Sequence, residues 1–264
     1  MDKKMLRLLL VVLLFGLVIS FSVAARTEAA AADKNKPKTL DTDPNLAGWW
    51  KFDEASGKIT PDSSKHGRNG TLKEELSFDK NSVQGRTGKA LKFDGDGYVE
   101  ITKYKGVTGT RARTVSAWIK TENDGGEIIS WGTDDFGQMF TFCFIRGRIG
   151  IRPNGGYYYM NEPTDDDKWH HEAVVVKEAE LPNLHDDVVL YKDGTIAEIH
   201  DIGLLDLWPI DTGSDLDVRI GREFEGLIDD VRIYDRVLSD EEVMALFKLQ
   251  SDRPYRNLKM IKLL

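Results

Sequence analysis

One stretch near the C-terminal end decides the fold: GLIDDVRIYDR at residues 226–236, followed by LSDEE at residues 238–242. Val231 and Ile233 alternate there with polar residues, which is the two-residue period of a strand buried on one face. Asp229 shares the parity of these apolar residues, so the pattern directs its carboxylate toward the core. A buried carboxylate needs a partner, because an unpaired charge in an apolar interior is strongly destabilising. A cation is one such partner.

The residues that follow predict one short C-terminal helix. Ser239 suits the N-cap, and Glu242 three residues later completes a capping box. Leu238 can pack on Val243 as a hydrophobic staple, so we expect the helix to continue to about Lys248. Helical periodicity is missing from the chain before this point.

Upstream, short strand patterns recur with turn residues between them. Residues 90–93 and 98–101 flank DGDG, which predicts a hairpin, and residues 188–191 and 195–199 flank KDG in the same way. Many short strands at this spacing predict an all-β fold, with two antiparallel sheets stacked as a sandwich or jelly roll. Further strands are predicted at residues 114–120, 128–131, 139–145, 148–152, 157–160 and 169–176.

The N-terminal residues have the layout of a secretory signal peptide. Lys3, Lys4 and Arg7 precede an apolar run over residues 8–25, and several alanines follow. We expect cleavage after residue 25, or as late as residue 32. An uncleaved N-terminal membrane anchor is the alternative, because a run of this length can span a bilayer. The predicted organisation is a signal peptide (1–25), a polar leader (33–47), one domain (48–250) and a C-terminal tail (251–264).

The composition indicates an acidic protein of the cell exterior, either secreted or held in the periplasm or cell envelope. The 264 residues include 44 acidic and 36 basic ones, giving a net charge of −8, and the predicted signal peptide removes more bases than acids. A nucleic-acid partner needs clusters of Lys and Arg, so this balance argues against one. The single Cys143 excludes an intrachain disulfide, and its alternation with Phe142 and Phe144 predicts a buried thiol. The oligomeric state stays open.

Eight motifs spread in order over nearly the whole exported part point to one family. They are GWWKFDE (48–54), DSS (62–64), GRNGTL (67–72), GKALKFDG (88–95), TVSAWI (114–119), WHH (169–171), LYKDG (190–194) and IDDVRIYDRVLSDEE (228–242). This set resembles the LamG-like jelly-roll family of the concanavalin A-like lectin/glucanase superfamily. The resemblance implies a jelly-roll sandwich with one concave face. It leaves the ligand open, because this fold serves lectins, glycan-binding appendages, adhesion modules and hydrolases.

The resemblance also implies a calcium ion where the first and last strands meet. Carried over by motif, its ligands would be Asp53, Asp62 and Asp229. Calcium takes roughly six to eight oxygen ligands and accepts backbone carbonyls, so a few carboxylates suffice. The alternative is that Asp62 begins an Asx turn and that Asp229 accepts backbone hydrogen bonds.

A catalytic pattern is present but sits in a turn sequence. ENDGGE at residues 122–127 has the Glu-x-Asp-x-x-Glu spacing of laminarinase-type glucanases in the same superfamily. Retaining hydrolysis needs two carboxylates about 5 Å apart on a rigid support. The central NDGG instead predicts a hairpin turn with its acids in water, so no catalytic residue is predicted.

Aromatic side chains are the remaining candidates for ligand contact, since sugar rings stack on exposed aromatic faces. Trp118 has the parity opposite to its apolar neighbours, which predicts an outward position. Tyr157 and Tyr159 share one face of their strand, and Trp208 lies in a predicted loop. Core packing is the alternative for each of them.

These observations predict an exported, non-catalytic module that binds carbohydrate or another extracellular surface ligand and is stabilised by calcium. Stable membrane insertion is not expected once the signal peptide is removed. Two alternatives stay open: a divergent glycoside hydrolase or lyase that uses acids on the concave face, and a protein-binding adhesion or assembly module.

Overall fold

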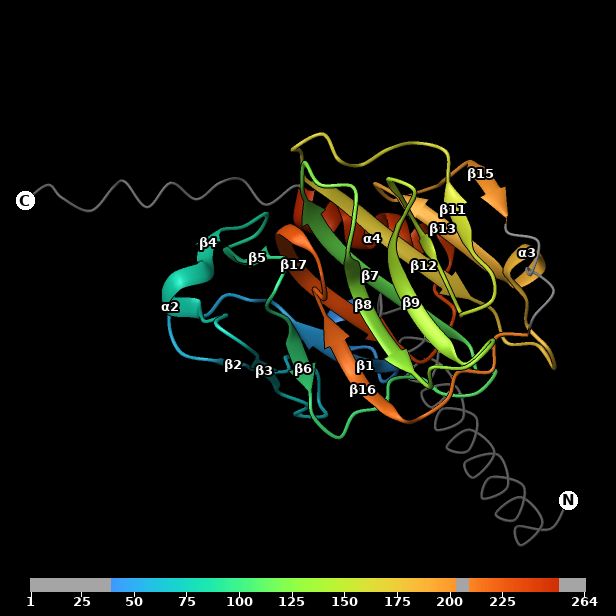
Figure 1. Cartoon of the computed structure of the whole chain (residues 1–264), viewed down its shortest axis with the longest axis horizontal. Coiled ribbons are helices and arrows are strands. Elements are labelled where there is room, and N and C mark those ends of the chain that lie inside the picture. Colours follow the sequence, from blue (N-terminus) through green and yellow to red (C-terminus); the bar gives the residue numbers. More distant parts are fainter. Residues whose placement is uncertain (1–38, 203–208, 252–264) are drawn as a thin grey trace, which may run out of the picture. The chain divides into compact units, whose positions relative to one another are not determined.

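The computed structural model describes residues 39–202 and 209–251, which form two antiparallel sheets packed face to face (Figure 1). Sheet A runs in the order β14 (Thr195–Ile196), β13 (Val188–Lys192), β12 (His170–Val176), β7 (Arg113–Lys120), β17 (Glu225–Tyr234), β5 (Lys89–Asp94) and β4 (Ser82–Gln84), and β1 (Leu46–Trp50) also pairs with β17. Sheet B runs in the order β15 (Ile199–Ile202), β11 (Tyr158–Met160), β10 (Arg148–Ile151), β9 (Met139–Ile145), β8 (Glu127–Gly132), β16 (Leu216–Ile220), β6 (Val99–Ile101), β3 (Gly70–Leu72) and β2 (Ile59–Thr60). The predicted all-β jelly-roll sandwich is confirmed.

The predicted C-terminal helix is present as α4 (Asp240–Ser251). Its capping box forms as expected: the Ser239 hydroxyl accepts from the Glu242 amide at 3.3 Å, and the Glu242 carboxylate accepts from the Ser239 amide at 3.0 Å. The sequence did not predict three single-turn helices, since one turn carries no readable periodicity. These are the 3-10 helix η1 (Leu40–Thr42), α2 (Phe78–Asn81) and α3 (Leu184–Asp187).

The predicted signal peptide and nearly all of the predicted tail fall outside the described residues. The folded unit starts earlier than residue 48, because η1 and β1 include residues that the sequence had assigned to the polar leader. Across residues 39–202 and 209–251, none of the helices has the length and apolar character needed to cross a bilayer.

Two predicted hairpins are instead connections between the sheets. β5 pairs with β4 and β17 in sheet A, whereas β6 pairs with β3 and β16 in sheet B, so the DGDG turn carries the chain from one sheet to the other. The NDGG turn does the same between β7 and β8. The hairpin of β13 and β14 is confirmed by their antiparallel pairing. Alternation predicts a strand, but it does not say which sheet the strand joins.

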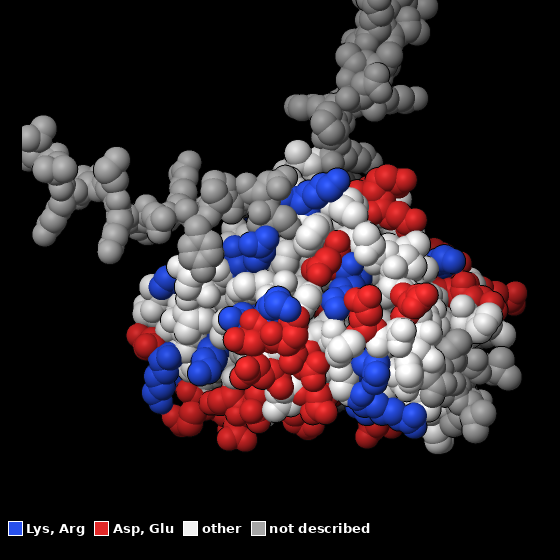
Figure 2. Space-filling model, turned by 90° about the horizontal axis from the view of Figure 1, so that it is seen from above, with Lys and Arg blue, Asp and Glu red and all other residues white. Residues whose placement is uncertain are grey.

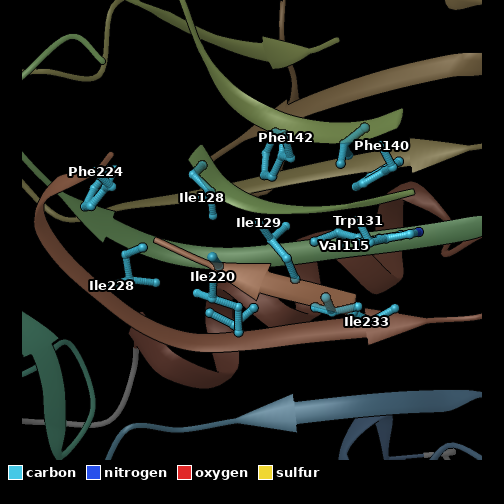
Figure 3. Packing of buried hydrophobic residues seen from close by; sticks show 14 of the residues in the cluster. Val115, Ile128, Ile129, Trp131, Phe140, Phe142, Ile220, Phe224, Ile228 and Ile233 are labelled. Carbon is cyan, nitrogen blue, oxygen red and sulfur yellow. The ribbon is translucent and has the colours of Figure 1, made fainter. Parts of the chain in front are cut away.

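Apolar side chains from the inner faces of both sheets form the core (Figure 3). Val115 and Ile233 of sheet A lie opposite Ile129 and Trp131 of sheet B in this layer. The Trp131 ring stacks on Phe140 with 4.2 Å between their centroids. Each fully buried large side chain stabilises the fold by roughly 1.5–3 kcal/mol, so this layer holds the two sheets as a rigid support.

A β-bulge in β17 reverses the direction predicted for Asp229. Ile228 lies opposite Ile119 on the inner face, and Asp229 lies opposite Trp118 on the outer face. The register then shifts before Arg232, and Asp230 takes a left-handed conformation with φ of 50°. The extra residue breaks the two-residue count, so Asp229 points away from the core instead of toward it.

In the described part of the chain, a helix covers the outer face of sheet A but not that of sheet B. Leu238, Val243 and Leu246 hold α4 against the outer face of sheet A, where they pack with Val175 and Tyr191. Sheet B lies toward the viewer in Figure 1, and no described helix lies across its outer face. The outer face of sheet B is therefore the open sheet surface of the described domain.

Candidate ligand-binding site

Asp62, the first predicted calcium ligand, is fully engaged by protein donors. Its Oδ1 accepts from the amides of Trp49 at 3.0 Å and Ser64 at 2.8 Å. Its Oδ2 accepts from the Ser64 hydroxyl at 2.8 Å and the Arg68 amide at 2.9 Å. These bonds form the Asx turn that was the alternative interpretation, and a cation here would have to displace them.

The other two predicted ligands meet at the loop of residues 85–89. Asp53 accepts from the Lys89 amide at 2.9 Å, and Asp229 accepts from the Thr87 amide at 3.0 Å. Asp229 is 1% exposed, and its pKa lies well above the usual range because of burial and the neighbouring charges of Asp230 and Asp53. A bound cation would relieve this crowding of negative charge.

The three aspartates do not converge on one point. Asp62 bonds to Trp49 of β1 and to residues 64–68, whereas Asp53 and Asp229 share the 85–89 loop. Among the residues that the structure describes, no group of three or more His, Cys, Asp or Glu side chains is arranged to hold a metal ion. Of the three predicted ligands, only Asp53 and Asp229 lie near each other, because both accept hydrogen bonds from the 85–89 loop.

The acids of the ENDGGE motif lie in different surroundings. Glu122 is exposed, as the turn predicts. Glu127 belongs to β8 and is 9% exposed, so the prediction that both glutamates point into water is wrong for this one. Its carboxylate accepts from the Ser130 hydroxyl at 2.6 Å and lies 3.5 Å from the Arg222 guanidinium. Because β8 starts at this second glutamate, its carboxylate lies on the strand and not in the turn.

A cleft of about 820 Å³ opens at the ends of β4, β5, β7 and β17. Acidic side chains gather around this end of the molecule, which Figure 2 shows from above with Asp and Glu in red. Lys120 is partly neutralised there by Asp167 at 3.3 Å. The cleft offers hydrogen-bonding groups, but its lining contains no exposed aromatic ring among the described residues. Its polar lining consists of Gln84, Lys92, Asp94, Lys120, Thr121, Glu122, Asn123, Asp167 and Glu225.

Trp118 lies on the outer face of sheet A, as its parity predicts, but it is 1% exposed. The Phe247 ring of α4 stacks on it at 5.6 Å between centroids, and the Arg86 guanidinium lies 4.7 Å from its ring centre. His171 fills its edge at 5.3 Å. Trp118 therefore has no ring face open to a sugar while α4 stays in place. Trp208, the other predicted tryptophan contact, lies outside the described residues.

Tyr157 and Tyr159 come together on the outer face of sheet B. Their ring centroids are 5.7 Å apart, and His200 stacks on Tyr159 at 5.4 Å. Tyr159 is 1% exposed, whereas Tyr157 is half-buried and His200 is exposed. Gly150 lies opposite Tyr159, where a Cβ would come within 2.6 Å of the Tyr159 Cβ, so this glycine makes room for the tyrosine. Tyr159 is therefore the buried middle ring of the three, and the rings of Tyr157 and His200 on either side of it are accessible to solvent.

Three arginines, which the sequence reasoning missed, flank these rings. Arg148 and Arg152 alternate with inward isoleucines of β10 and so face outward, and the Arg146 guanidinium lies 5.2 Å from the ring centre of Tyr157. A sequence signal existed: residues 139–161 contain these arginines and no Asp or Glu, in a chain where one residue in six is acidic. We name this surface the tyrosine–arginine face. It comprises Arg146, Arg148, Arg152, Tyr157, Tyr159 and His200.

Comparison with solved structures finds the same fold in proteins of low sequence identity. Domain 4 of AbnA, a GH43 extracellular arabinanase from Geobacillus stearothermophilus in complex with arabinotriose, superposes with a TM-score of 0.55 at 19% identity, over 76% of this chain and 98% of that one. The sialidase of Trypanosoma rangeli, in complex with 2,3-difluorosialic acid, gives 0.53 at 12% identity, over 83% of this chain and 35% of that one. The binding domain of Paraclostridial Mosquitocidal Protein 1 gives 0.52 at 17%, over 78% and 52%.

Sequence comparison adds the family. No curated protein sequence matches this chain significantly. The model of the family described as the concanavalin A-like lectin/glucanases superfamily matches residues 93–244, which is more than half of the chain. The ordered motifs and the two-sheet fold agree with this match, and the chain belongs to the concanavalin A-like lectin/glucanase superfamily.

Proposed function

We propose that this chain is an exported, non-catalytic glycan-binding module whose binding surface is the tyrosine–arginine face. The observation that carries the proposal is the contiguous row of Tyr157, Tyr159 and His200 on a sheet face that no described helix covers. The apolar side of a sugar ring stacks on such rings, and guanidinium groups donate to its hydroxyls. The arabinotriose complex of the similarly folded arabinanase domain supports this ligand class.

The face is held ready for binding before any ligand arrives. Tyr159 is buried between Tyr157 and His200, with Cys143 and Ile145 beneath the same cluster. The Arg146 guanidinium sits over the Tyr157 ring, and the Arg148 side chain donates to the Asn161 carbonyl at 2.7 Å. Side chains fixed in this way lose little conformational entropy when a ligand binds, which favours affinity.

A glycan array probed with Tyr157→Ala tests the proposal. Truncating an aromatic anchor costs at least about 1 kcal/mol of binding free energy, so affinity should fall about fivefold or more. Ile196→Ala is the matched control, because Ile196 is an exposed apolar side chain at the edge of sheet A. Equal binding by the parent chain and the Tyr157 variant would reject this surface.

A second candidate function is glycan hydrolysis in the acidic cleft, favoured by the position of Glu122 beside Asp167 and Glu225 in its lining. Polysaccharide degradation, followed by the release of reducing ends, separates the two functions. Turnover that Glu122→Gln abolishes would establish the enzyme, and glycan binding without product release supports the module. A protein-binding adhesion or assembly role is the third alternative, which a pull-down from the native cell envelope would reveal.

Calcium remains a proposal for stability, with Asp53 and Asp229 as its side-chain ligands. Thermal unfolding of chelator-treated protein, with and without millimolar calcium, tests it. We expect calcium to raise the melting temperature and Asp53→Asn to remove that rise. Asp79→Asn is the control, since Asp79 is an exposed acid that bonds to Gly57, outside the 85–89 loop. Unchanged melting of the parent chain would exclude a calcium site.

A further inference from the structure

We infer that the glycan bound at the tyrosine–arginine face is acidic and carries carboxylate or sulfate groups. This inference rests on the proposed function and specifies its ligand. Guanidinium groups pair with carboxylate or sulfate oxygens through two parallel, charge-assisted hydrogen bonds, which are about twice as strong as bonds to neutral hydroxyls.

The first support is the electrostatic isolation of the arginines. Arg148 donates only to backbone carbonyls, and Arg152 is exposed; neither has a carboxylate partner within the part of the chain that the structure describes. The strands that carry them, from Met139 to Asn161, contain no acid, although the neighbouring strand β15 places Asp201 opposite Tyr159. An anionic ligand would meet these guanidinium groups without first displacing a carboxylate from either of them.

The second support is a further arginine on the same sheet face. One row of neighbouring residues crosses sheet B from the end of β10 to β16. The amide of Arg152, just after β10, donates to the Thr141 carbonyl of β9. Thr141 lies opposite Ser130 of β8, and Ser130 lies opposite Arg219 of β16. The buried Nε of Arg219 has no hydrogen-bond partner among the described residues, although Glu100 of β6 lies opposite Arg219 and the Glu127 carboxylate accepts from Ser130 in the same row. Three strand spacings separate the two arginines, roughly 14 Å. A polymer with repeated charges could therefore contact both, whereas a single sugar could not.

The third support is the contrast with the acidic end of the molecule. The loops that border the cleft carry Glu122, Asp124, Asp166 and Asp167, and Figure 2 shows acidic side chains gathered on this end. An anionic polymer is repelled there and attracted to the tyrosine–arginine face. The charge distribution thus favours one sheet face for such a ligand, although the net charge of the chain is −8.

The test compares each acidic glycan with its neutral counterpart on the full chain. Calorimetry or affinity electrophoresis would use polygalacturonate against fully methyl-esterified pectin for carboxylate, and dextran sulfate against dextran for sulfate. We expect at least one acidic polymer to bind about tenfold or more tightly than its partner, and Arg152→Gln to remove most of that preference. Lys65→Gln, which loses the same charge from an exposed loop position, should leave it unchanged.

Each outcome separates this inference from the proposed function. A charge preference that needs both Arg152 and Tyr157 supports both. Equal binding of acidic and neutral polymers, weakened alike by Tyr157→Ala, overturns the acidic ligand and leaves glycan binding in place. Binding of none of the four polymers overturns the acidic ligand, and a negative glycan array would then reject the function too. Charge preference that Lys65→Gln reduces as much as Arg152→Gln would overturn the assignment to this face.

Discussion

Outward-facing aromatic side chains are buried on sheet A, whereas some of those on sheet B are accessible to solvent. On sheet A, α4 covers Trp118, and the neighbouring Arg232 bridges Asp230 and Asp41. On sheet B, Tyr157 and His200 keep ring surface accessible beside Arg148, which donates only to backbone carbonyls, and the exposed Arg152. Both faces show the same alternation in the sequence. The comparison teaches that an outward aromatic residue becomes a core residue or a binding residue according to what the rest of the chain places over it.

Truncation on the covered face should give the largest effect. Trp118→Ala removes a fully buried ring and leaves Phe247 and His171 without their contact. Loss of a buried tryptophan costs about 3–5 kcal/mol, which guanidinium-chloride unfolding would measure. Glycan binding below the unfolding transition should stay unchanged. A loss under about 1 kcal/mol would mean that α4 does not bury this ring in solution.

Breaking the buried charge network on the same face should come next. Arg232 lies 3.3 Å from the Asp230 carboxylate and 2.6 Å from that of Asp41, and its guanidinium covers the Trp49 ring at 4.0 Å. Arg232→Ala leaves Asp230 buried without its cation, so we expect a loss of roughly 3 kcal/mol in the free energy of unfolding. Arg111→Ala, at an exposed loop arginine, is the control and should cost far less. Equal losses would show that the network adds nothing.

The interior of sheet A should add a pH-dependent effect. Glu172 points inward opposite Ala117, and burial raises its pKa well above the usual value; neither carboxylate oxygen has a partner among the described side chains and backbone. Its protonated form stabilises the fold fully below about pH 4.5, and this contribution is lost as the pH rises toward the folded pKa.

Glu172→Gln cannot ionise, so its free energy of unfolding should decline less steeply above that pH. The difference in slope can reach about 1.4 kcal/mol per pH unit. Melting temperatures of both proteins from pH 4 to pH 9 would measure it. Parallel curves would contradict the raised pKa.

Truncation on the open face should have the smallest effect on stability. Tyr157→Ala removes a half-buried ring, so unfolding should change by no more than about 1 kcal/mol, although glycan binding is expected to drop. Guanidinium-chloride unfolding would measure both variants, and Tyr159→Ala should show a larger loss because Tyr159 is buried. Equal losses for the two variants would contradict the different roles of the two residues, in which Tyr159 supports the face and Tyr157 contacts the ligand.

Local patterns could be predicted from the sequence, whereas the pairing register of the strands and the element that covers each sheet face could not. The capping box of α4 and the alternation of most strands follow from neighbouring residues, so they were predicted correctly. The bulge at Asp230 depends on pairing with β7, and the burial of Trp118 depends on where α4 docks; both arise from contacts more than 100 positions apart. Of the site, only the tyrosines were predicted. The arginines were overlooked because their signal is a stretch without Asp or Glu, and a search for motifs looks for residues that are present.

The pairing of β1 with β17 also sets the order in which the fold can be completed. Trp50 lies opposite Val231, and Leu46 lies opposite Tyr234. Because the ribosome makes β1 before every other described strand and β17 after them, β1 must wait for all of these strands before its only described sheet partner exists. A nascent chain that stops short of residue 231 leaves the tryptophans of β1 without that partner, so the pairing of β1 in sheet A can form only after the other described strands have been made.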